Sequence, residues 1–220
     1  WCDDEGKVID DGTVTRLASD TFRWTAAHPN LRWLVENATG LDVEVEEVSE
    51  RVAALALQGP TSRGLLRSVC TAPVETLKYF RTAGGEIAGV PVDVSRTGYT
   101  GDLGYEIWMP WDRAVAVWDA LASAGPAFDL HAAGMLALDV ARVEAGLLLI
   151  DVDFQSSRKA LIESQKYTPS ELGLGRLVDL GKSSFVGRRA LVDEHRRGHG
   201  RQIVGLELDW PEVEALYEDV

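Results

Sequence analysis

Hydrophobic and polar residues alternate with a period of two in several segments of the 220-residue chain, which predicts strands. Residues 12–24 alternate on both sides of a polar turn at 18–20, a pattern typical of a hairpin. Residues 42–48 alternate almost strictly, so we expect a strand whose valines pack inward and whose carboxylates face water. The apolar run 53–60, which ends in a turn, and the β-branched runs 89–94 and 105–109 predict further strands.

Helical spacing of apolar residues appears between these segments. Pro29 opens a short helix that should end before Gly40. Further helices are expected over residues 61–69, over 112–125 with Asp112 as the N-terminal cap, and over 135–144. Because strands and helices interleave and several strand pairs should be antiparallel, we predict an α+β fold with mixed, mostly antiparallel sheets.

The segment Ser95-Arg-Thr-Gly-Tyr-Thr-Gly-Asp-Leu-Gly-Tyr-Glu-Ile107 places three glycines, a tyrosine and a carboxylate between two strand-like runs. Its glycines fall where a connection needs positive φ or a close approach of the backbone. Such a turn can bring Tyr99 and Glu106 toward one concave surface. Glu106 lies in a run suited to burial, where a carboxylate must find donors or lose its charge. The alternative is a structural turn with Glu106 on the wet face of an edge strand.

Composition and charge exclude several classes of function. The formal net charge is −13, with 22 Lys and Arg against 35 Asp and Glu, which argues against a nucleic-acid partner. We expect the basic run over residues 188–201 to solvate the end of a helix. No apolar run is long enough to span a membrane and no signal peptide is recognisable, so a cytoplasmic location is expected. Cys2 and Cys70 predict free thiols. His195 and His199 are four residues apart, but their arginine-rich neighbourhood would repel a cation, so no metal is expected.

The 95–107 segment closely resembles the signature of the aminomethyltransferase family, the T-protein of the glycine cleavage system and its relatives. Other landmarks of that family are matched in the same order along almost the whole chain. They are Gly6-Lys-Val-Ile-Asp-Asp11, Leu57-Gln-Gly-Pro60, Ala141-Arg-Val-Glu-Ala-Gly-Leu147, Pro169-Ser-Glu-Leu-Gly-Leu-Gly175 and Phe185-Val-Gly-Arg-Arg-Ala-Leu191.

The resemblance implies a folate-binding fold with ferredoxin-like α+β subdomains around a cavity that holds tetrahydrofolate. In such proteins an aminomethyl group passes from a lipoyl-carrying protein to the folate. Asp11 aligns with the family's catalytic aspartate, although the local sequence alone favours a loop with a solvated charge pair. Glu106 aligns with the carboxylate that grips the pterin ring, Tyr99 would line the same pocket, and Thr13 is a further expected contact. Arg142 is expected to be a buried structural partner of a carboxylate.

Departures from the family pattern leave the one-carbon donor open. Leu138 stands where glycine-cleavage members carry a folate-site arginine, which folate domains of the sarcosine and dimethylglycine dehydrogenase type also lack. Thr25 replaces an asparagine of the family, and residues 149–153 replace its usual Tyr-Gly stretch. The predicted function is therefore a tetrahydrofolate-dependent aminomethyl or methyl transferase. The alternatives are the folate domain of a demethylase or amine-oxidising enzyme and a non-catalytic folate-binding protein.

The resemblance also sets the expected domain organisation. Residues 1–200 should form a folate-binding domain that lacks its N-terminal segment, and residues 201–220 should begin a C-terminal β-barrel. The expected partners are a small one-carbon donor or a lipoyl carrier protein, with neither nucleic acid nor membrane.

Overall fold

The structure is a computed structural model that describes residues 1–218. These residues form two compact units. The first unit joins residues 1–11 to the segment that begins at Leu149, and the second unit spans Gly12–Leu148. The predicted division at residue 200 stays a prediction, and its last two residues, 219 and 220, lie outside the described part of the chain.

The strands are β1 (Gly12–Arg16), β2 (Phe22–Ala26), β3 (Val52–Gln58), β4 (Thr82–Ile87), β5 (Val90–Ser95) and β6 (Gly104–Pro110). The α-helices are α1 (Leu31–Asn37), α2 (Ser62–Val69), α3 (Ala114–Ala124), α4 (Met135–Glu144), α5 (Arg188–Arg197) and α6 (Trp210–Glu218). Short 3₁₀ turns cover Ser49–Arg51, Trp111–Arg113, Gly125–Phe128, Glu163–Gln165 and Gly175–Leu177.

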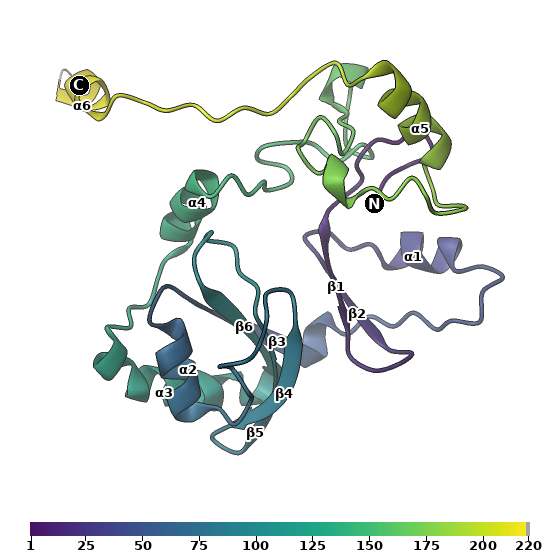
Figure 1. The fold of residues 1–220 in the computed structure, drawn as a ribbon. Coiled ribbons are helices and arrows are strands. Elements are labelled where there is room, and N and C mark those ends of the chain that lie inside the picture. The colour runs from purple at the N-terminus through teal and green to yellow at the C-terminus, as the bar shows by residue number, and fades with distance from the viewer. Residues whose placement is uncertain (219–220) are drawn as a thin grey trace. The chain divides into compact units, whose positions relative to one another are not determined.

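The second unit is built on a four-stranded antiparallel sheet of order β3-β6-β5-β4, and α2 and α3 cover one of its faces (Figure 1). The predicted antiparallel α+β arrangement is therefore confirmed. Strand alternation explains the layering, because successive side chains of a strand point to opposite faces. Val92 and Val94 of β5 and Tyr105 and Ile107 of β6 are buried in the core between sheet and helices. Leu66 of α2 completes this core from the helical side.

The predicted hairpin over residues 12–24 is confirmed, since β1 and β2 pair antiparallel with Thr13 opposite Thr25 and Thr15 opposite Arg23. The predicted strand over residues 42–48 is wrong. That segment pairs with no strand of the described part of the chain, and Val43 is 60% exposed while Val45 and Val48 are only half-buried, so the alternation does not produce a buried face. The predicted cap of α3 is also wrong, because Asp112 lies in a 3₁₀ turn and Arg113 occupies the N-cap position.

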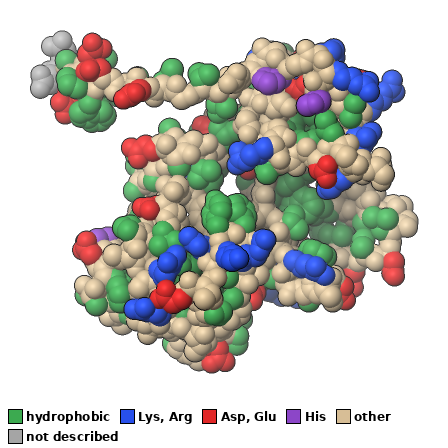
Figure 2. Space-filling view, in the orientation of Figure 1, with side chains coloured by type: hydrophobic (Ala, Val, Ile, Leu, Met, Phe, Trp, Pro, Cys, Tyr) green, Lys and Arg blue, Asp and Glu red, His purple; other side chains and the backbone are tan. Residues whose placement is uncertain are grey.

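The first unit ties the N-terminal residues to the C-terminal part of the chain. The backbone N–H of Val8 donates to the carbonyl of Tyr167, and the carbonyl of Val8 accepts from the N–H of Ser157, both at 2.8 Å. Val8, Phe154 and Leu191 are buried within this unit. Figure 2 shows Lys and Arg side chains gathered over α5, whose last turn is basic as expected for a helix C-terminus.

No helix among the described residues is long and apolar enough to cross a membrane.

Candidate functional site

The sheet of the second unit has a polar face opposite its helix-covered face. Because Tyr105 and Ile107 point into the core, Glu106 and Trp108 of β6 point to the other side. The register places Ser95 of β5 directly opposite Glu106, and Asp93 opposite Trp108. These four side chains therefore share one patch, which we call the acidic patch.

The Thr97 hydroxyl holds the Glu106 carboxylate within the acidic patch, and the Ser95 hydroxyl, 2.8 Å from Thr97 Oγ1, lies beside it. Thr97 donates its hydroxyl hydrogen to Glu106 Oε2 at 2.5 Å, and the Ser95 hydroxyl lies 3.4 Å from the same oxygen. The Trp108 indole N–H points to Ser95 Oγ at 3.4 Å. Among the described residues, the hydrogen bonds to this carboxylate all end on Oε2, so Oε1 retains the capacity to accept from a further donor. The prediction that Glu106 finds donors is confirmed.

The glycine-rich turn before β6 is organised by the side chain of Gln58 at the end of β3. Gln58 Nε2 lies 3.2 Å from the carbonyl oxygen of Tyr105 and 3.4 Å from that of Thr97, and so joins the two ends of the turn. A Cβ at Gly98 or Gly104 would lie 1.9 or 1.7 Å from Gln58 Oε1, so a side chain at either position requires the Gln58 amide to move. The expected close approach is confirmed at both glycines.

Tyr99 lies in this turn and its hydroxyl donates to the backbone carbonyl of Leu148. The bond connects the turn to the chain that follows α4. Gly101, at φ +76°, supplies the left-handed backbone conformation that the turn needs, and a Cβ there would approach Ala145 Cβ to 2.7 Å. The role of Tyr99 in ligand binding stays a prediction.

Arg23 of β2 extends the acidic patch from the hairpin. Its guanidinium carbon lies 4.2 Å from the centre of the Trp108 ring, and Nη1 lies 3.4 Å from Asp93 Oδ2. The side chain is only 10% exposed. Burial lowers the pKa of Arg23, while the carboxylates of Asp93 and Glu106 act in the opposite direction. Arg23 is thus a buried cation beside two carboxylates.

Thr13 shares the hairpin face from which Arg23 reaches Trp108. Thr13 and Thr15 of β1 lie two residues apart and therefore on one face, and Arg23 is the partner of Thr15 in the register. Thr13 is half-buried, whereas its neighbour Val14 is 60% exposed on the other face. The predicted contact of Thr13 with a ligand stays a prediction.

Asp11 belongs to the first unit, one residue before β1 begins. Its backbone N–H donates to Asp10 Oδ1 at 2.8 Å, and Asp10 is fully buried. Burial raises the pKa of Asp11 above its ordinary value, and the carboxylate of Asp10 raises it further. Because Asp11 and Glu106 lie in different units, their convergence on one cavity stays a prediction.

Arg142 of α4 is structural, as expected from the sequence. Its Nε donates to Asp139 Oδ1 at 2.7 Å and its Nη1 donates to the carbonyl of Leu147 at 3.2 Å. Its side chain is buried, so the guanidinium stabilises the end of the helix and the chain that follows.

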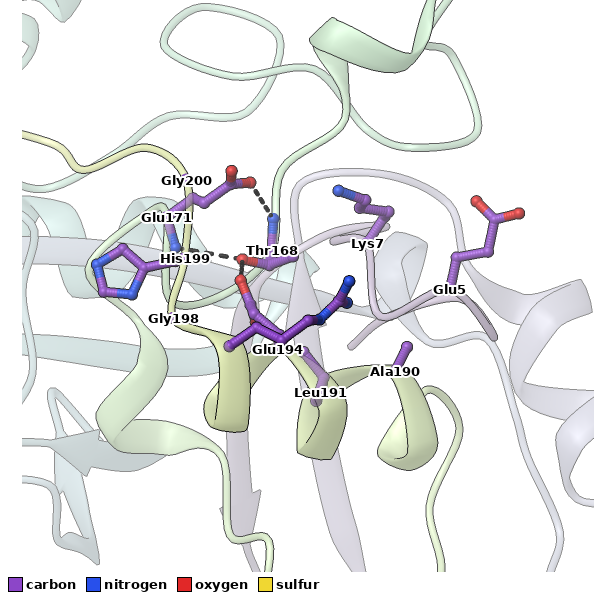
Figure 3. A pocket seen from close by; sticks show the side chains of 11 residues that line it. Glu5, Lys7, Thr168, Glu171, Ala190, Leu191, Glu194, Gly198, His199 and Gly200 are labelled. Carbon is purple, nitrogen blue, oxygen red and sulfur yellow. Dashed lines mark hydrogen bonds between the residues drawn. The ribbon is translucent and has the colours of Figure 1, made fainter.

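A cavity of about 300 Å³ lies within the first unit, and none of the predicted site residues is among the side chains that line it (Figure 3). Thr168 is at its centre: its hydroxyl donates to Glu194 Oε1, and its backbone N–H donates to Glu171 Oε2 at 3.0 Å. Arg201 donates from Nε to Glu171 Oε1 at 3.0 Å. The Arg201 guanidinium therefore neutralises the carboxylate of Glu171, whereas Glu194 receives a hydrogen bond from a neutral hydroxyl.

Sequence reasoning did not identify Arg23, Thr97 or Trp108 as site residues. The period-two pattern of β6 contains a signal for Trp108, which shares the face of Glu106. The position of Thr97 depends on how the turn folds back, and that of Arg23 on how the hairpin packs. Among the described residues, no cluster of His, Cys, Asp or Glu is arranged to hold a metal ion.

Comparisons with known proteins agree with this architecture. Residues 1–182 match the GCVT N-terminal domain family. An aminomethyltransferase of Halothermothrix orenii is 37% identical over 211 residues, which cover 94% of this chain and 56% of that protein. A trimethylamine-oxide aldolase of Ruegeria pomeroyi is 42% identical over 222 residues, covering 94% of this chain and 27% of that protein.

A solved structure also matches. The crystal structure of glycine cleavage system aminomethyltransferase T from Bartonella henselae superposes with a TM-score of 0.74 and 26% identity, covering 89% of this chain and 51% of that one. The chain thus spans about half the length of the aminomethyltransferases it matches.

Proposed function

Because the chain belongs to the GCVT N-terminal domain family, we propose that it binds tetrahydrofolate and serves the transfer of a one-carbon group, aminomethyl or methyl, to it. Bound tetrahydrofolate supplies nitrogen nucleophiles that accept the one-carbon group. The residues of this chain supply binding, orientation and control of a proton.

The observation that carries the proposal is the arrangement around Glu106. Thr97 fixes Oε2 of this carboxylate, with the Ser95 hydroxyl beside it, and among the described residues these hydrogen bonds leave Oε1 able to accept from a further donor. The edge of a pterin ring presents an amino group and a ring N–H side by side, which suits a carboxylate acceptor, and charge-assisted hydrogen bonds of this kind are short and strong. The residues of the acidic patch therefore fit the group that the family implies, with Tyr99 and Thr13 as proposed further contacts.

Asp11 is the proposed catalytic residue. A carboxylate can orient an attacking nitrogen, accept its proton and stabilise developing positive charge. A raised pKa makes Asp11 a stronger base than an exposed aspartate, which is typical of residues that transfer protons near neutral pH.

The one-carbon donor is proposed in two forms. An aminomethyl group carried by a lipoyl protein is the donor if the chain acts as the named aminomethyltransferases do. The relative named trimethylamine-oxide aldolase is more similar in sequence, at 42% identity, and favours a methylated amine as the source. Leu138 agrees with this second candidate, because glycine-cleavage members carry arginine there.

Calorimetry with tetrahydrofolate on the full-length protein tests the proposal. Glu106→Gln should weaken binding by about 10- to 100-fold, the loss expected for a charge-assisted hydrogen bond. Asp11→Asn should preserve binding and abolish transfer of the one-carbon group. Glu86→Gln, a change of an exposed carboxylate on β4, is the matched control and should alter neither.

Two results would contradict the proposal. If the protein does not bind tetrahydrofolate, the proposed function as a whole is excluded. If Asp11→Asn transfers the one-carbon group at the full rate, Asp11 is not catalytic. Assays with a lipoylated carrier protein and with a methylated amine then separate the two donors.

A further inference from the structure

Arg23 combines a buried position with hydrogen-bond donors that have no partner in the described part of the chain. Among the described residues, its Nε and Nη2 are buried without a hydrogen-bond partner. Its one ion pair runs from Nη1 to Asp93 Oδ2 at 3.4 Å, longer than a well-formed charged hydrogen bond. The side chain is nine-tenths buried and stacked on Trp108.

A purely structural role does not account for this arrangement. An arginine with unsatisfied donors loses solvation without gaining hydrogen bonds in exchange, whereas an apolar side chain would stack on Trp108 without that loss. The guanidinium fork directs Nε and Nη2 along one edge, a geometry suited to an oxygen acceptor. The two free donors therefore indicate an acceptor that arrives with a ligand.

The charges around Arg23 define the chemistry of that acceptor. Asp93 Oδ2 lies 3.4 Å from Arg23 Nη1. Glu106 shares the sheet face of Trp108, on which the guanidinium stacks, so two carboxylates lie on the side of this cation. A further anion would be repelled, whereas a neutral carbonyl oxygen would not. Glu106 and Trp108 lie two residues apart on β6, about 6–7 Å, a spacing that one bicyclic ring bridges.

We propose that Arg23 binds a ring carbonyl of the ligand held by Glu106, so that the acidic patch selects pteridines with an oxo group over their amino analogues. The inference rests on the proposed function, since it assigns a specificity-determining residue of the same site. In this arrangement Glu106 accepts from the donor edge of the ring, and Arg23 donates from Nε and Nη2 to the carbonyl. An amino group at that position is itself a hydrogen-bond donor, so two donors would face each other and no hydrogen bond to the guanidinium would form.

The test measures dissociation constants of tetrahydrofolate and tetrahydroaminopterin, its 4-amino analogue, by anaerobic calorimetry. The unmodified protein should prefer the oxo compound by about 10-fold or more. Arg23→Met should reduce that preference by about 10-fold, mainly because the variant binds tetrahydrofolate more weakly. Arg23→Lys keeps the charge and loses the fork, so its preference for the oxo compound should lie between those of the unmodified protein and Arg23→Met. Arg32→Met is the matched control, because the Arg32 side chain is 92% exposed on α1.

The outcomes separate this inference from the proposed function. If tetrahydrofolate binding depends on Glu106 but the oxo preference is the same in the unmodified protein, in Arg23→Lys and in Arg23→Met, the role of Arg23 is refuted. The proposed function would stand. No binding of tetrahydrofolate by the unmodified protein would refute the proposed function. Should Arg23→Met fail to fold, as judged by circular dichroism, Arg23→Lys decides the question, because an unchanged preference in that variant refutes the need for the guanidinium fork.

Discussion

Replacing Gly104 by alanine tests whether Gln58 organises the site. A Cβ at Gly104 would lie 1.7 Å from Gln58 Oε1, so the amide of Gln58 must move away. It then loses its hydrogen bonds to the carbonyls of Tyr105 and Thr97, at 3.2 and 3.4 Å. Neutral hydrogen bonds contribute about 1 kcal/mol each, so the loss is about 2 kcal/mol. Alanine restores about 0.5–1 kcal/mol through its lower backbone entropy in the unfolded chain.

The net expectation is a free energy of unfolding lower by about 1–1.5 kcal/mol. With an m-value of about 2 kcal/mol per molar urea, the midpoint of unfolding should fall by about 0.5–0.75 M. Circular dichroism and tryptophan fluorescence follow the transition. Gly84→Ala in β4 is the matched control: nothing lies within 4 Å of its Cβ, so this substitution should be neutral or slightly stabilising.

A double-mutant cycle identifies the cause. In a Gln58→Ala background the clash is absent, so Gly104→Ala should no longer destabilise the protein, and the two changes should couple by about 2 kcal/mol. Strictly additive effects, or a neutral Gly104→Ala in the unmodified background, would refute the explanation.

Three further predictions concern ionisable groups. Burial raises the pKa of Asp11, so the folded state binds the carboxyl proton of Asp11 more tightly than the unfolded state does. The stability of the unmodified protein relative to Asp11→Asn should therefore fall as the pH rises from about 4 through the raised pKa, and urea unfolding at a series of pH values from 4 to 8 measures this difference. Burial raises the pKa of Glu171, but the hydrogen bonds from Arg201 prevail and lower it. The stabilising contribution of the Glu171 carboxylate should therefore be present at neutral pH and lost below about pH 4, and Arg201→Met should make the free energy of unfolding depend less on pH in that acid range. Burial raises the pKa of Cys2 to about 11, and that of Cys70 is also raised, so both thiols should resist a disulfide reagent at pH 8 until the protein is unfolded, and fast labelling would contradict their burial.

Periodic patterns in the sequence predicted the elements whose apolar faces find a partner. Residues 90–94 and 105–109 became β5 and β6, and residues 61–69 became α2, because their buried side chains meet in one core. The same logic failed over residues 42–48, where the alternation is equally regular. A period specifies only which residues share a face, and the surrounding chain decides whether that face is covered.

For the candidate site, the sequence alone determined the residue types of the glycine-rich turn, the acceptor Glu106 and the structural nature of Arg142. The tertiary structure decided which donors hold Glu106, why a side chain at Gly98 or Gly104 would displace Gln58, and that Arg23 stacks on Trp108. The physical reason is that local propensity acts between neighbours along the chain. Contacts between Arg23 and Trp108, or between Gln58 and the turn, instead depend on strand register and packing between distant segments, which no local pattern encodes.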